Sequence, residues 1–130
     1  MAEYIEKTDQ QKARAYSPAV ITQGGRTVWL AGQTATHDEQ GNDISANFEA
    51  QVRTIFSLID KTLKGAGGSL ANMVTMTVFI VDPRHGDRFV EMRAGFFPGG
   101  NYPASALITV SNFARPGMLI EIQGVAVIDG

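Results

Sequence analysis

The sequence contains no cysteine and only two histidines among its 130 residues. The lack of cysteine excludes disulfides, thiol nucleophiles and thiolate metal sites. Charged residues make up only 18% of the chain and the net charge is -2, so no basic excess is present to bind nucleic-acid phosphates. No apolar run approaches the roughly 20 residues that span a membrane, and the polar N-terminus does not resemble a signal peptide. We therefore expect a cytoplasmic protein with no nucleic-acid or membrane partner.

The length fits one domain, residues 1–130, with a single core. The clearest element is a helix at residues 47–64, where apolar side chains recur every three or four positions. Asn47 can cap the start of this helix and Gly65 is a natural stop. A second helix is expected from about residue 86 to residue 97, where a glycine-rich turn follows.

Strands are expected around these two helices, at residues 19–22, 27–31, 74–81, 104–110 and 118–128. The first two flank a Gly-Gly turn and can form a hairpin. Residues 74–81 carry apolar side chains on both faces, which indicates a central strand. The order is ββ-α-β-α-ββ, which predicts an α+β sheet with helices on one face. The uncovered face of such a sheet points to an oligomer.

Several short fragments, spread over nearly the whole chain, form a recognisable series. They are Tyr16-Ser17-Pro18-Ala19-Val20, Leu30-Ala31-Gly32-Gln33, Val78-Phe79-Ile80-Val81-Asp82, Phe96-Phe97, Tyr102-Pro103-Ala104 and Ile120-Glu121-Ile122. In this order they resemble the RidA/YjgF family of enamine/imine deaminases (endoribonuclease L-PSP). The resemblance implies a chorismate-mutase-like fold of the Bacillus type and a homotrimer with a central β-barrel. It also implies a small-molecule pocket at each subunit interface, and water-mediated hydrolysis of 2-imino or 2-amino-enoic acids with no cofactor and no metal.

The resemblance places Glu121 in the catalytic role, because it matches the glutamate that positions the water in the family. Glu121 lies between two isoleucines in an otherwise apolar strand. The alternative for Glu121 is an interface carboxylate bonded to backbone, and for Tyr16 a core aromatic with its hydroxyl at the rim. The substrate-binding residues that the resemblance implies are Tyr16, Ala31, Gly32, Val90, Phe96 and Ser105.

Three polar positions of the family's pocket are altered in this chain. Ser105 stands where the family has an arginine that pairs with the substrate carboxylate, Val90 replaces an asparagine, and Ala31 replaces a serine. We therefore expect a less anionic substrate than the standard 2-imino acid. The cations that could substitute from a neighbouring subunit are Arg14, Arg84, Arg88 and Arg93, although we expect each to be a solvated surface charge.

Three functions remain open at this point. The first is hydrolysis of an enamine, imine or related C–N bond in a small reactive metabolite, with Glu121 holding the water and His37 as a further candidate base. The alternative is a non-catalytic small-molecule-binding or regulatory protein of the same family. A ribonuclease is disfavoured, because the isoelectric point is about 5.6 and no basic stripe is present.

Overall fold

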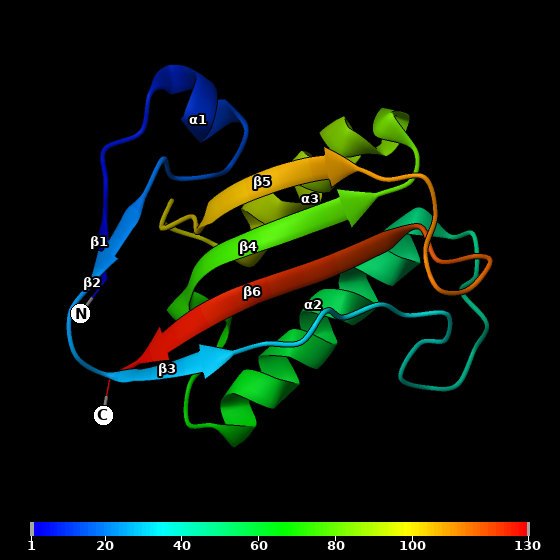
Figure 1. Cartoon of the computed structure of the whole chain (residues 1–130), viewed down its shortest axis with the longest axis horizontal. Coiled ribbons are helices and arrows are strands. Elements are labelled where there is room, and N and C mark those ends of the chain that lie inside the picture. The colour runs from blue at the N-terminus through cyan, green and yellow to red at the C-terminus, as the bar shows by residue number, and fades with distance from the viewer. Residues whose placement is uncertain (1, 130) are drawn as a thin grey trace.

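The computed structural model describes residues 2–129. Its centre is a four-stranded sheet in the order β3-β6-β4-β5, and both long helices lie on the far side of this sheet in Figure 1. The elements of this layer are β3 (Arg26–Trp29), α2 (Phe48–Gly65), β4 (Met73–Ile80), α3 (Gly86–Phe96), β5 (Ala104–Thr109) and β6 (Ile120–Ile128). The predicted α+β fold with helices on one face is confirmed. No helix among the described residues is long and apolar enough to cross a membrane.

Helix α2 lies within one residue of the predicted bounds at each end. The Asn47 side chain accepts a hydrogen bond from the backbone N–H of Ala50, and the helix ends at Gly65. Its apolar stripe is buried against the sheet: Phe48, Val52, Ile55, Ile59 and Leu63. Helix α3 follows a short 3-10 helix, η2 (Pro83–His85), and buries Phe89 completely.

Strand β4 is the central strand that the sequence predicts, since it pairs antiparallel with β6 and parallel with β5. Its alternate residues Met76, Val78 and Ile80 are buried under the helices. Phe79 faces the other way, on the surface that we call the open face of the sheet. Trp29 of β3 lies on this open face and is 79% exposed.

The expected hairpin of the first two predicted strands is wrong. Strand β2 (Val20–Thr22) pairs with β1 (Ala2–Tyr4) in a separate small sheet, while β3 pairs with β6. Strands β5 and β6 follow one another in the chain, yet they are not neighbours in the sheet because β4 lies between them. The turn residues show where the chain reverses, but they do not show which strand pairs with which. Helix α3 is the crossover that carries the chain from β4 to a parallel position at β5.

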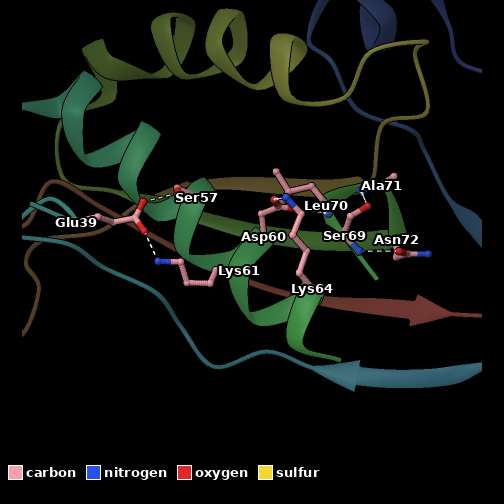
Figure 2. A network of polar contacts seen from close by, with 9 residues as sticks. All are labelled: Glu39, Ser57, Asp60, Lys61, Lys64, Ser69, Leu70, Ala71 and Asn72. Atoms are coloured by element: carbon pink, nitrogen blue, oxygen red, sulfur yellow. Dashed lines mark hydrogen bonds and ion pairs between the residues drawn. The ribbon is translucent and has the colours of Figure 1, made fainter. Parts of the chain in front are cut away.

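Polar side chains on the exposed side of α2 bond to the loop before the helix and to the loop after it, as Figure 2 shows. Glu39, in the long loop between β3 and α2, accepts hydrogen bonds from Ser57 and Lys61 of the helix. Beyond the helix, the Asp60 carboxylate accepts the backbone N–H of Leu70 at 3.0 Å. The first contact steadies the chain that runs from the end of β3 to α2.

Candidate functional site

A pocket of about 200 Å³ lies where α3, β5 and the chain between α1 (Asp9–Ala13) and β2 meet. It is lined by Arg14, Tyr16, Val90, Arg93, Ser105 and Leu107. Three of the predicted substrate-binding residues, Tyr16, Val90 and Ser105, are therefore brought together. We call this group the arginine pocket.

Tyr16 reaches the arginine pocket because its segment is bonded to the start of β5. The backbone N–H of Ser17 donates to the carbonyl of Pro103 at 3.1 Å, and the buried Ser17 hydroxyl donates to the carbonyl of Tyr102. In Figure 1, α1 accordingly lies close to the beginning of β5. These two hydrogen bonds hold the loop before β2 against the first residues of β5.

Arg93 is the residue of the arginine pocket whose burial the sequence did not reveal. It is only 2% exposed, so the expectation of a solvated surface charge is wrong for this residue. Its Nη1 donates to Oγ of Ser105 at 2.6 Å, and its Nη2 donates to the carbonyl of Arg14 at 2.9 Å. The signal was its position four residues after Phe89, which places both side chains on one face of α3. The guanidinium lies 5.0 Å from the Phe89 ring centre.

The arginine pocket is cationic. Burial, and to a lesser extent the nearby Arg14, lowers the pKa of Arg93 to about 10, so this side chain stays protonated at neutral pH. No carboxylate among the described residues pairs with Arg93, and its buried Nε has no hydrogen-bond partner there. Arg14, by contrast, is half-buried and pairs with Asp87 at 2.7 Å.

A second group of predicted site residues lies on the open face, at the start of β6. Gln33 and Ile122 exchange two backbone hydrogen bonds, of 2.8 and 3.1 Å, so the segment Ala31–Gln33 runs beside β6. A Cβ atom on Gly32 would collide with the Glu121 carboxylate. That carboxylate therefore rests on the Gly32 backbone. Within residues 2–129 no hydrogen bond or ion pair engages it, and we call this group the glutamate site.

The arginine pocket and the glutamate site lie on opposite faces of the sheet. Ser105 pairs with Met76, which faces the helices, whereas Glu121 pairs with Phe79 on the open face. Met76 and Phe79 are three positions apart on β4, and side chains alternate along a strand. One chain alone cannot present both groups to one small substrate.

The remaining candidates lie elsewhere. Phe96 stacks on Phe56 at 4.3 Å and does not line the arginine pocket, so its contact with substrate stays a prediction. His37 is exposed, with Nδ1 3.2 Å from the Thr36 hydroxyl. His85 stacks on Phe48 at 4.2 Å. Across residues 2–129, no three histidine, aspartate or glutamate side chains gather where they could hold a metal ion.

The fold and the two groups define a small α+β protein with a cationic pocket at one edge of its sheet. The chain belongs to the endoribonuclease L-PSP family, whose model matches residues 7–128, and thus to the RidA/YjgF proteins. It is 29% identical to a RutC family protein of Pyrococcus horikoshii over 111 residues, which is 85% of each chain.

Solved structures agree with this assignment. The conserved Rid family protein YyfB of Yersinia pestis is 25% identical with a TM-score of 0.86, and the match covers 98% of both chains. RidA from an Antarctic Psychrobacter species is 29% identical with a TM-score of 0.71, over 87% of this chain and 88% of that one. The family and the fold are therefore established by both sequence and structure.

Proposed function

We propose that the protein is a RidA-like hydrolase that cleaves an enamine, imine or related C–N bond of a small reactive metabolite. The observation that carries this proposal is the Glu121 carboxylate, which rests on the exposed Gly32 backbone and has no hydrogen-bond or ion-pair partner among residues 2–129. A carboxylate so placed can hold a water molecule against an electrophilic carbon. Family membership supports a RidA-like role without naming the substrate.

The reaction needs one base that later acts as an acid. Water adds to the carbon of the protonated imine while Glu121 takes one proton from the water, which gives a neutral carbinolamine. Glu121 then returns this proton to the nitrogen, the C–N bond breaks and ammonia leaves, and the hydroxyl proton passes to Glu121 as the carbonyl forms. Each proton transfer of this kind contributes roughly 10²- to 10⁴-fold to the rate. No metal or organic cofactor enters this scheme.

We further propose that the complete site forms between copies of the chain, in a cytoplasmic homotrimer. The arginine pocket of one copy would then face the glutamate site of its neighbour. The opposite placement of Ser105 and Glu121 on the sheet supports this arrangement. So do the large apolar side chains on the open face, where Trp29 is 79% and Ile108 is 42% exposed.

The substrate we propose is not the standard 2-imino acid of the family. Val90 cannot hydrogen-bond a ligand, and the pocket's buried cation comes from α3 instead of β5. The walls of the pocket are therefore shaped differently, although their charge is retained. A related imine or enamine with a different side chain would fit these walls.

The test is an assay of carbonyl release from imines of 2-oxo acids with increasing side-chain length, generated in situ. We expect the wild type to exceed the buffer rate for at least one imine, and Glu121→Gln to lose about 10²-fold or more. Glu91→Gln, an exposed carboxylate on α3, is the matched control and should keep the wild-type rate. No rate above buffer, or an active Glu121→Gln, would refute the proposal and favour the non-catalytic binding protein.

The shared site has its own test. Ser105→Trp, which fills the arginine pocket, and Glu121→Gln should each be inactive. After the two are mixed under conditions that exchange subunits, about a quarter of the interfaces would combine two intact halves. Recovered activity supports a site between copies, whereas a mixture as inactive as its components contradicts it.

A further inference from the structure

Arg93 is a buried cation that the protein leaves partly unsatisfied. Its guanidinium carries five N–H groups, of which two donate to Ser105 and to the Arg14 carbonyl. The buried Nε–H has no partner within the described chain. Buried charges are normally paired, because an unpaired one is costly. Asp87, on the same helix, pairs with Arg14.

We propose that Arg93 binds the carboxylate of the substrate, so that the arginine pocket is an anion subsite supplied by helix α3. This inference rests on the proposed hydrolase and adds one substrate-binding residue to it: Arg93 of α3 takes the place of the family's arginine on β5. The short Ser105 side chain leaves room for the Arg93 guanidinium on the helix side of β5, where the family's arginine would begin. On this proposal the substrate is anionic, which differs from the expectation drawn from the sequence.

The other polar groups of the pocket suit the same ligand. The Ser105 hydroxyl accepts a hydrogen bond from Arg93, so its own hydrogen is free to donate to an anion. Arg14 adds a second positive charge at the rim, partly offset by the exposed Asp87. A guanidinium fork and a hydroxyl together match the two oxygens of a carboxylate.

The size and walls of the pocket restrict the rest of the molecule. The volume of about 200 Å³ holds a carboxylate and a few carbon atoms. Val90 and Leu107 form apolar walls, which favour a short hydrocarbon side chain. The carbon that loses its nitrogen would lie at the mouth of the pocket, toward the Glu121 of a neighbouring copy.

The first test measures binding by calorimetry. The probe is 2-oxobutanoate, a carboxylate without a C–N bond, and butanone is its uncharged counterpart. We expect the wild type to bind 2-oxobutanoate, Arg93→Gln to bind it about 10²-fold more weakly and Arg93→Lys to fall between them. Arg88→Gln, an exposed arginine on the same helix, is the matched control and should bind as the wild type does. Equal binding by wild type and Arg93→Gln, or no binding by the wild type, overturns the inference.

The second test needs no substitution, so it holds even if the Arg93 variants unfold. The Nε–H of Arg93 should give a protected ¹⁵N NMR signal that moves on titration with 2-oxobutanoate and stays still with butanone. A signal unmoved at saturating 2-oxobutanoate overturns the inference.

These tests separate the inference from the proposed function. Arg93-dependent binding without any imine turnover would leave the anion subsite intact and refute the hydrolase. Imine turnover with Arg93-independent binding would do the reverse.

Discussion

Nη1 of Arg93 lies 2.6 Å from Oγ of Ser105, so a helix and a strand meet through one charge-assisted hydrogen bond inside the arginine pocket. Ser105 stands on β5 where the family has an arginine, and its hydroxyl accepts a hydrogen bond from the arginine of α3. The two positions form a unit, and a change at one has to be judged with the other.

Exchange of the two side chains tests this unit. Ser105→Arg alone would bring two guanidinium groups into about 200 Å³, so we expect a lower melting temperature and no gain in 2-oxobutanoate affinity. The double variant Arg93→Ser/Ser105→Arg should recover much of both, since neighbouring substitutions are not additive. Thermal unfolding and calorimetry check the result. Tighter binding by Ser105→Arg, with unchanged stability, would contradict the coupling.

Substitution of Gly32 should reduce activity as much as substitution of Glu121. In Gly32→Ala the new methyl group would collide with the Glu121 carboxylate and displace it. We expect a loss of imine hydrolysis similar to that of Glu121→Gln, of about 10²-fold or more, with little change in melting temperature because Gly32 is exposed. Gly65→Ala, where a Cβ meets nothing within 4 Å, serves as the control. A fully active Gly32→Ala enzyme would show that the carboxylate position is unimportant.

Gln51 is a buried side chain on which stability depends. Its Nε2 donates to the carbonyls of Ile44 and Gly117, at 3.0 and 2.7 Å, and its Oε1 accepts the N–H of Leu119 at 2.9 Å. Gln51→Leu would leave these backbone groups without partners, so we expect a loss of about 3 kcal/mol in the free energy of unfolding. Urea denaturation measures this, with the exposed Arg53→Gln as control. A loss below about 0.5 kcal/mol would contradict the assignment.

Asp82 provides a prediction about pH. The Arg84 side chain, helped by its backbone N–H, lowers the pKa of Asp82 from 3.8 to about 2. A carboxylate whose pKa is lowered by folding stabilises the fold fully at pH values above its ordinary pKa. This contribution is lost as the pH falls toward 2. A ¹³C NMR titration should therefore find the Asp82 midpoint near 2, and Arg84→Met should raise it. Arg88→Met is the control, and an unmoved midpoint in Arg84→Met would rule out this cause.

The parts of the fold that depend on local sequence could be predicted. The cap at Asn47 and the apolar stripe after it lie within one helix, so the bounds of α2 are confirmed. The partner of β3 could not be predicted, because the Gly-Gly turn before it gives no information on β6. The partner of β5 could not be predicted either, because the local sequence does not show that the crossover through α3 places β5 parallel to β4.

In the site, too, the features that depend on local sequence could be predicted and the tertiary contacts could not. The resemblance identified Tyr16, Val90 and Ser105, and the structure brings these three together. It also showed that a cation was missing from β5. It could not show the replacement, because Arg93 meets Ser105 only when α3 packs on the sheet. That contact is tertiary and leaves no motif in the sequence.

The bare tryptophan on β3 has a practical consequence. Trp29 is the only tryptophan in the chain and lies almost fully in solvent on the open face. Its fluorescence is therefore an intrinsic optical reporter for whatever covers that face. Emission at the long wavelength of hydrated indole marks a separate chain, and a blue shift on raising the protein concentration marks association. The stoichiometry and affinity of self-association can thus be read from unlabelled protein, in the same cuvette as the enzyme assay.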